Sequence, residues 1–295
     1  MDNVELLKGV GRVSFEALSY ARGLVKPGAK KLEVAERIEK FMVEKGFGLA
    51  FPVNLSSNEE AAHSTPESGS NEVFGEKDVV KVDLGARKED ALGDCAITVD
   101  LSSEYGKLVE ASEEALEAAI SMVRGGLAVR EIGKTVGEIA AKHGFNPIRN
   151  LGGHGIEKGD LHARIFIPNY DNGDDAMLEE GQTIAIETFI TTGKGLVTES
   201  DYVQIFRKLG PAQLRSPDSR EVASFIDENF STYPFALRWL HSKFNSEFKV
   251  KAALNDIARA DNIESFPVLI ESSKGIVAQT EKEMIVEKDS CTVIT

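Results

Sequence analysis

The sequence contains little cysteine and no long apolar run. Only two of its 295 residues are cysteines, Cys95 and Cys291, and they lie far apart in the chain. This usage favours a reducing compartment over a disulfide-stabilised fold. No stretch approaches the roughly 18 consecutive apolar residues of a membrane span, and the N-terminal residues lack the apolar segment of a secretory signal. These absences predict a soluble, cytoplasmic protein.

Positive charge is scarce relative to negative charge. Lysine and arginine together number 34, aspartate and glutamate number 48, and the formal net charge is −14. Nucleic acids and anionic membranes repel such an acidic surface, so we expect neither as the main partner. The hydrophobic fraction of 42% is that of an ordinary globular protein, and the length allows one large domain or two small ones.

Apolar residues recur at helical and strand spacings in a mixed order. The first half predicts two helices, then strands that include a hairpin over residues 78–101, then two more helices, and strands return in the second half. This order predicts an α+β fold in which helices cover one face of a mostly antiparallel sheet. The helices are expected at 4–24, 31–45, 104–124 and 129–143, and the other strands at 48–58, 164–170, 182–193 and 275–295.

Residues 200–268 differ from the sequence on either side. Helical patterns recur at 219–230, 235–244 and 250–260, and a strand pattern resumes only after them. We therefore predict an inserted helical subdomain over 200–268. The main domain would consist of residues 1–199 and 269–295.

Four acidic residues interrupt apolar, strand-like segments. Asp83 and Asp94 lie in the two arms of the predicted hairpin, and a turn centred on residues 87–90 would place them opposite each other. Two facing carboxylates repel and are costly to bury unless a cation lies between them; the alternative is that both face solvent. Glu187 and Glu281 lie in later strands, where the alternatives are an edge-strand charge or a buried ion pair.

A histidine completes a candidate metal site. His154 lies among glycines in the segment GGHGI, so its ring can closely approach a large neighbour. Four carboxylates and one imidazole suit Mn²⁺, Fe²⁺, Co²⁺ or Zn²⁺, and four negative charges exceed the usual need of one divalent ion. Two ions that share bridging carboxylates would balance this charge, as in two-metal hydrolases. The candidate ligands are Asp83, Asp94, His154, Glu187 and Glu281.

These residues, their order and their approximate spacing resemble those of the methionine aminopeptidases. The resemblance covers almost the whole chain and implies the pita-bread (creatinase/aminopeptidase) fold. It also implies that 200–268 is the insert of the type 2 branch, in a short, archaeal-like form. The matching segments are KVDLG (Asp83), GDCAITV (Asp94), GGHGI (His154), AIETF (Glu187) and AQTEKEMIV (Glu281), together with AAHSTP (His63) and GDLHA (His162).

The resemblance implies hydrolytic removal of the initiator methionine from nascent or short peptides with a small second residue. Asp83 would bind one metal ion, His154 and Glu187 would bind the other, and Asp94 and Glu281 would bridge both. The ions would activate a shared water molecule.

The same resemblance implies roles for residues around the metals. Glu187 would pass a proton to the departing amine. His162 would contact the scissile carbonyl or amide, and His63 would assist from the other side of the cleft. The wall of the methionine pocket would contain Phe51, Pro52 and Asn54.

One motif departs from the family pattern. The last motif usually reads Glu-His-Thr, whereas this chain has Glu281, Lys282 and Glu283. If Lys282 or Glu283 faces the metals, it would alter metal preference, rate or local pKa values. If both point away, we expect no change.

Two other functions fit the same fold. An Xaa-Pro aminopeptidase or prolidase generally carries a further N-terminal domain, for which His63 comes too early. A catalytically silent binding protein would have lost metal ligands, whereas all five are present here. The partner expected is a peptide or nascent-chain N-terminus. Ribosome association fits such a substrate, and family precedent favours a monomer.

Overall fold

The computed structural model describes residues 2–295. The helices are α1 (Asp2–Leu24), α2 (Lys31–Glu44), α3 (Gly106–Met122), α4 (Val129–Lys142), α5 (Pro217–Asn229), α6 (Leu237–Phe244) and α7 (Glu247–Arg259). The strands are β1 (Gly48–Leu49), β2 (Asn54–Ser57), β3 (Glu60–Ala62), β4 (Val79–Leu84), β5 (Ala86–Lys88), β6 (Ala91–Leu92), β7 (Cys95–Asp100), β8 (Asn146–Pro147), β9 (Gly152–Glu157), β10 (Asp160–Pro168), β11 (Thr183–Thr191), β12 (Val197–Lys208), β13 (Phe235–Ala236), β14 (Ile263–Glu271), β15 (Val277–Val286) and β16 (Cys291–Val293).

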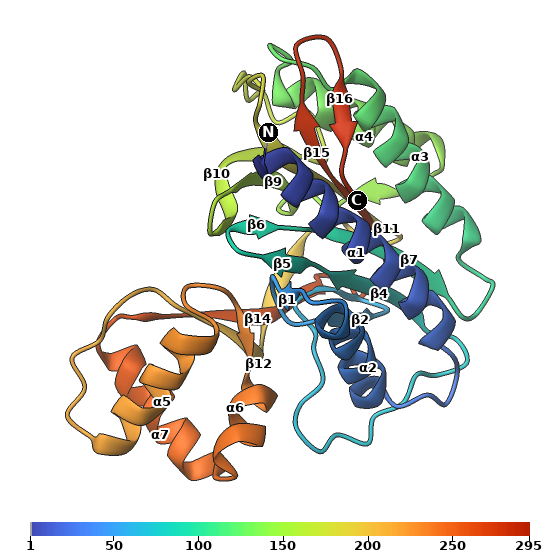
Figure 1. The fold of residues 1–295 in the computed structure, drawn as a ribbon. Helices are drawn as coiled ribbons and strands as arrows, with labels where there is room; N and C mark the ends of the chain where they lie inside the picture. Colours follow the sequence, from blue (N-terminus) through green and yellow to red (C-terminus); the bar gives the residue numbers. More distant parts are fainter. Residues whose placement is uncertain (1) are drawn as a thin grey trace.

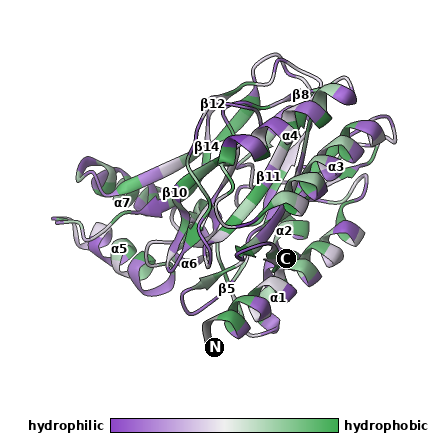
Figure 2. Ribbon diagram, turned by 90° about the horizontal axis from the view of Figure 1, so that it is seen from above, coloured by the Kyte–Doolittle hydropathy of each residue, from purple (hydrophilic) through white to green (hydrophobic). Residues whose placement is uncertain are grey.

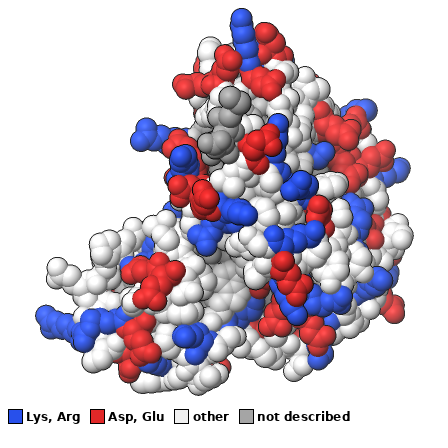
Figure 3. All heavy atoms as spheres, in the orientation of Figure 1, with Lys and Arg blue, Asp and Glu red and all other residues white. Residues whose placement is uncertain are grey.

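The largest sheet is antiparallel and runs in the order β10-β9-β11-β15-β7-β4-β2, with β16 beside β15 and β8 beside β11. Helices α1 to α4 lie along one side of it (Figures 1 and 2), and the predicted α+β arrangement is confirmed. On the face drawn in Figure 3, positive and negative side chains are interspersed. Within the described residues, no helix combines the length and apolar character needed to cross a membrane.

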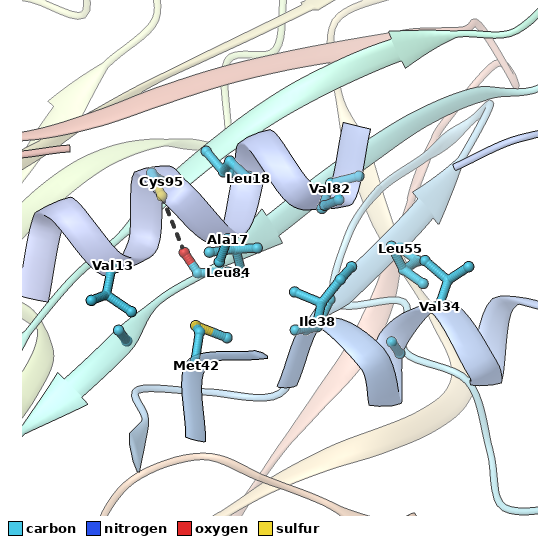
Figure 4. Close-up of a cluster of buried hydrophobic side chains, with 14 of the residues drawn as sticks. Val13, Ala17, Leu18, Val34, Ile38, Met42, Leu55, Val82, Leu84 and Cys95 are labelled. Carbon is cyan, nitrogen blue, oxygen red and sulfur yellow. Dashed lines mark hydrogen bonds between the residues drawn. The ribbon is translucent and has the colours of Figure 1, made fainter. Parts of the chain in front are cut away.

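Helices α1 and α2 bury apolar stripes against the strands behind them. Residues spaced three or four apart point to one side of a helix, and here those residues are buried. Figure 4 shows them packed against Val82 and Leu84 of β4 and Leu55 of β2. Helix α2 ends before Gly46, whose φ of +83° suits glycine. The stripes are formed by Val10, Val13, Ala17 and Leu18 in α1 and by Val34, Ile38 and Met42 in α2.

The chain between residues 200 and 268 forms α5, α6 and α7 between two long strands. The three predicted helices are present, and their apolar side chains share a cluster with Phe235. The pairing of β12 with β14 was missed, and these strands form a second sheet with β3 and β13. The helices form a lobe at the lower left of Figure 1. The boundary of a separate domain at 200–268 stays a prediction.

Two local predictions were wrong. The turn of the hairpin consists of Glu89 and Asp90, so its centre lies one residue later than that of the predicted turn over 87–90. Asp83 therefore pairs with Ala96 and not with Asp94. Glu89 has a φ of +55°, the left-handed conformation that a tight two-residue turn needs. The strand expected over 48–58 divides into β1 and β2, and Pro52, which has no amide N–H for a ladder bond, lies between them.

The buried carboxylate of Glu271 hydrogen-bonds to two loops, the one that joins β11 to β12 and the one that joins β14 to β15. Glu271 is 0% exposed. Its Oε1 accepts hydrogen bonds from the N–H groups of Lys194 (2.6 Å) and Gly195 (3.1 Å). Its Oε2 accepts from Ser273 N (2.7 Å), Ser273 Oγ (2.8 Å) and Gly275 N (2.8 Å). Burial alone would raise its pKa, but these donors outweigh burial and hold the pKa below its ordinary value.

We therefore predict that Glu271→Gln lowers the free energy of unfolding at neutral pH by about 1.5–3 kcal/mol, the range for hydrogen bonds to a charged group. A lowered pKa stabilises the fold above the unfolded-state pKa, and this stabilisation is lost as pH falls through the folded-state pKa. The deficit of the variant should therefore shrink in acid. Urea unfolding at neutral and acidic pH measures it, and a deficit that does not depend on pH would contradict the assignment.

Candidate metal centre

Neighbouring strands bring three of the predicted ligands, Asp83, Glu187 and Glu281, to one face of the large sheet. Cross-strand partners point to the same side, and the register links Glu187 to Glu281, Glu281 to Ala96, Ala96 to Asp83, and Asp83 to Asn54. These residues form a row across β11, β15, β7, β4 and β2.

A second row lies beside the first. His154 pairs with Ala185, and Ala185 pairs with Glu283. Asp94 precedes β7, and its N–H donates to Glu283 Oε2 at 3.3 Å. All five predicted ligands therefore meet at one place.

The histidine lies close to three of the four carboxylates. Its Nε2 is 3.5 Å from Asp94 Oδ2 and 4.0 Å from both Glu187 Oε1 and Glu281 Oε1. The ligand atoms of Asp94, His154 and Glu281 all lie within 4.8 Å of one another. The fifth residue, Asp83, lines the same cavity of about 420 Å³.

Burial makes the charged forms of these carboxylates costly. It raises the pKa of Asp83 to about 7 and raises the pKa values of Asp94, Glu187 and Glu281 well above their ordinary range. Neighbouring carboxylates add to the shift for the last three. Burial also lowers the pKa of His154 to about 4, so its ring is neutral and free to bind a cation near neutral pH.

The unpaired atoms of the site test whether cations fit it. Asn54 Oδ1, Asp83 Oδ1 and Gln279 Oε1 are buried without a hydrogen-bond partner among the described residues. All three are acceptors, and they lie around Asp83. A set of oxygen acceptors and one neutral imidazole, with an excess of negative charge, is the donor set that divalent transition ions prefer. The residues therefore fit the predicted metal ions.

A glutamine that the sequence reading missed holds two of the carboxylates. Gln279 Nε2 lies 3.2 Å from Asp83 Oδ2 and 3.3 Å from Glu187 Oε2. Its own backbone N–H donates to Thr98 Oγ1, and the Thr98 hydroxyl donates to the Gln279 carbonyl oxygen. The signal was present in the sequence, because Gln279 lies two residues before Glu281 and so faces the same side of β15.

The two residues that depart from the family motif point in opposite directions. Lys282 lines a small cavity with Phe15 of α1, on the helix-covered side of the sheet. Glu283 is 0% exposed, lies on the metal-ligand side and reaches the Asp94 backbone. Burial raises its pKa to about 8. Of the two alternatives left open by the sequence, a residue facing the site is the one observed, and it is Glu283.

The two other predicted histidines lie in the same cavity. The rings of His162 and His154 lie edge to face with centroids 4.5 Å apart, and His162 belongs to β10. His162 lies where the pairing of β9 with β10 shifts register, between Asp160 and Ala163. His63 lies edge-on to Phe266, and its Nδ1 is 3.2 Å from the Pro267 carbonyl oxygen.

The residues predicted for the methionine pocket are buried, and two of them reach the cavity. Phe51 and Asn54 line it, whereas Pro52 does not belong to the lining formed by the described residues. The Pro52 carbonyl instead accepts a hydrogen bond of 2.8 Å from Asn54 Nδ2. The walls are otherwise largely apolar, with Leu161, Ile165, Phe166, Phe189 and Phe266 among them.

The model of metallopeptidase family M24 matches residues 5–206. The chain belongs to this family. As an M24 metallopeptidase it resembles the methionine aminopeptidase of Pyrococcus horikoshii, with 42% identity over 99% of each chain. It also resembles that of Archaeoglobus fulgidus, with 40% identity over 99% of this chain and 98% of the relative.

Solved structures share the fold of this chain. The whole chain superimposes on a thermophilic Arx1 with a TM-score of 0.87, 18% identity and 91% of that chain covered. It superimposes on methionine aminopeptidase from Thermotoga maritima with a TM-score of 0.72, 22% identity and 96% coverage. For the prolidase from Pyrococcus furiosus the TM-score is 0.64 at 17% identity, with 64% of that chain covered. The predicted pita-bread fold is confirmed.

The buried carboxylates give the metal-stripped protein a characteristic pH dependence. A carboxyl group with a raised folded-state pKa stabilises the fold at low pH, and that stability is lost as pH rises through the folded-state pKa. We predict that the Tm of the stripped protein falls from about pH 5 to about pH 8, across the raised pKa values of Asp83 and Glu283. Added Mn²⁺ should reverse the fall, because ion binding favours the folded state.

Asp83→Asn is the matched variant, because it removes one buried charge without changing the shape of the side chain. It should raise the Tm of the stripped protein near pH 8 and reduce the increase produced by Mn²⁺. A change of 1 kcal/mol in the free energy of unfolding shifts the Tm by roughly 2–4 °C in chains somewhat shorter than this one. A stripped protein whose Tm is the same across this pH range would contradict the assignment.

Proposed function

We propose that this M24 metallopeptidase hydrolyses the first peptide bond of peptides that begin with methionine and have a small second residue. The observation that carries the proposal is the meeting of four buried carboxylates, His154 and two further histidines at one largely apolar cavity. Full-length relatives at about 40% identity bear the name methionine aminopeptidase, which supports the same activity.

The finer features of the proposal follow from the same residues. We propose two divalent ions, Co²⁺, Mn²⁺, Fe²⁺ or Zn²⁺, because four carboxylates carry more charge than one ion balances. The type 2, short archaeal-like form is supported by the helices between β12 and β14 and by full-length archaeal relatives. The substrate is the N-terminus of a peptide or nascent chain. Ribosome association, a monomeric state and a cytoplasmic location stay predictions.

Bound ions would supply Lewis acidity, which polarises the scissile carbonyl group. Glu187 is proposed as the proton carrier: its carboxylate takes a proton from the attacking water and delivers it to the leaving amine nitrogen. Gln279 holds Glu187 Oε2 at 3.3 Å, so the carboxylate is oriented before substrate enters. The largely apolar walls exclude water and so strengthen each polar contact inside the cavity.

The neutral histidines are proposed to contact the peptide bond itself. Burial lowers the pKa of His162 far below its ordinary value, so its N–H donates to the carbonyl oxygen without carrying a charge. Burial also lowers the pKa of His63. The Pro267 carbonyl can only accept, so the His63 proton lies on Nδ1 and leaves Nε2 as an acceptor for the scissile N–H or the amine.

The expected activity is metal-dependent release of free methionine from a Met-Gly-Ser peptide. Stripped protein should be inactive, and Mn²⁺, Fe²⁺, Co²⁺ or Zn²⁺ added singly should restore release to different extents. An Xaa-Pro dipeptide serves as the comparison substrate. Cleavage of that dipeptide alone would instead identify the protein as a prolidase. Metal binding without hydrolysis of either substrate would favour the binding-protein alternative.

Glu187→Gln should lower kcat by at least about 10²-fold, the lower range for positioned acid–base groups, because the amide cannot carry the proton. The loss would be larger if ion binding also weakens. Methionine release is measured together with circular dichroism, which should show an intact fold. Glu180→Gln is the matched control, because the same change is made at an exposed residue just before β11. A Glu187→Gln enzyme as active as this control would refute the role.

A further inference from the structure

A buried ion pair joins the helical lobe to the main body. Arg238 is the second residue of α6, and Glu39 lies in α2; their exposed fractions are 3% and 7%. Arg238 Nη2 donates to Glu39 Oε1, and Trp239 Nε1 donates to Glu39 Oε2 at 3.1 Å. Hydrogen bonds offset the cost of burying a charge, and this carboxylate is bonded on both oxygens.

The same network extends to the backbone of Val53. Glu39 Oε1 also accepts the Val53 N–H at 3.3 Å, and Thr65 Oγ1 donates to the Val53 carbonyl oxygen at 2.8 Å. Arg238 Nη1 donates to Thr65 Oγ1 at 2.6 Å and to the Pro66 carbonyl oxygen at 3.2 Å. Both polar groups of Val53 are therefore held by side chains that Arg238 orients.

These anchored residues border the substrate side of the cavity. Val53 lies between Phe51 and Asn54, which line it, and Thr65 follows His63 by two residues. His63 has a φ of +66°, a conformation that costs energy in a residue with a side chain and needs firm neighbours. One guanidinium group thus anchors both segments, 51–54 and 63–66, that contribute side chains to this wall.

We propose that Arg238, together with Glu39, is a positioning residue through which the helical lobe sets the shape of the substrate pocket. The inference rests on the proposed function for what the pocket binds. The ion pair acts through the backbone of Val53 and the Thr65–Pro66 segment. It therefore acts on binding of the substrate's first residue and leaves the proton transfer by Glu187 intact.

Three variants separate positioning from stability: Arg238→Met, Glu39→Leu and the double variant. Each single change leaves one buried charge unpaired, whereas the double change removes both charges and keeps apolar volume. We expect the Tm of the double variant to lie above the Tm of either single variant and close to that of the wild type. KM for the methionyl peptide should stay raised by roughly 10-fold, with kcat within about twofold, since a small misplacement weakens a preorganised site. Mn²⁺ affinity by calorimetry should match the wild type.

Lys208→Met is the matched control. Lys208 is a 2% exposed cation of β12 that pairs with Asp227 of α5 at 2.7 Å, inside the helical lobe. The variant removes a buried cation that pairs with a half-exposed carboxylate, away from segments 51–54 and 63–66. We expect KM to match the wild type in this variant.

Hydrogen exchange measured by mass spectrometry tests the inference without relying on activity. The double variant should exchange faster across residues 51–66, while α3 and α4 exchange as in the wild type. A double variant with wild-type KM and wild-type exchange at 51–66 would overturn the positioning role. If the wild type releases no methionine, the proposed function fails, and exchange at 51–66 alone decides the role of Arg238.

Discussion

The burial of like charge on one face of a sheet is the constraint on which this structure depends. Asp83, Glu187 and Glu281 lie in one register row, and Asp94 lies in the next. Burial and mutual repulsion raise the pKa values of Asp94 and Glu281 together. Such a face is stable only when protons or cations neutralise it, so the strands must be held by the apolar core on their other side. Helices α1 to α4 supply that core.

Small residues in the same rows make room for the carboxylates. Ala96 separates Glu281 from Asp83, and Ala185 separates His154 from Glu283. The glycine before His154 is required for a similar reason, because space between the strands is limited. A Cβ at Gly153 would lie 2.2 Å from the Ala185 carbonyl oxygen, so only glycine allows β9 to approach β11 this closely. The close approach, rather than an unusual backbone angle, accounts for the glycine before His154.

The alternation of strand residues explains why side chains singled out in the sequence lie on one face of the sheet. Side chains alternate between the two faces of a strand, so a shift in strand pairing by two residues leaves Glu187 and Glu281 facing the site. The pairing of Asp83 with Asp94 depended on where the hairpin turned, and the turn centre lies one residue later. A shift of the centre by one residue moves each partner by two and so preserves the face. The aspartates therefore meet although they are not opposite each other. Contacts such as Arg238 with Glu39, 199 residues apart, leave no such local pattern.

The same alternation makes the two ends of the site chemically different. Gln279 and Glu283 flank Glu281 at two residues on either side and share its face. At one end, the Gln279 amide donates toward Asp83 and Glu187 and so offsets part of their negative charge. At the other end, Glu283 adds a carboxylate beneath Asp94. The two ends therefore differ in what surrounds their carboxylates: a side-chain amide contacts Asp83 and Glu187, whereas a second acidic side chain, held by the Asp94 backbone N–H, lies beside Asp94.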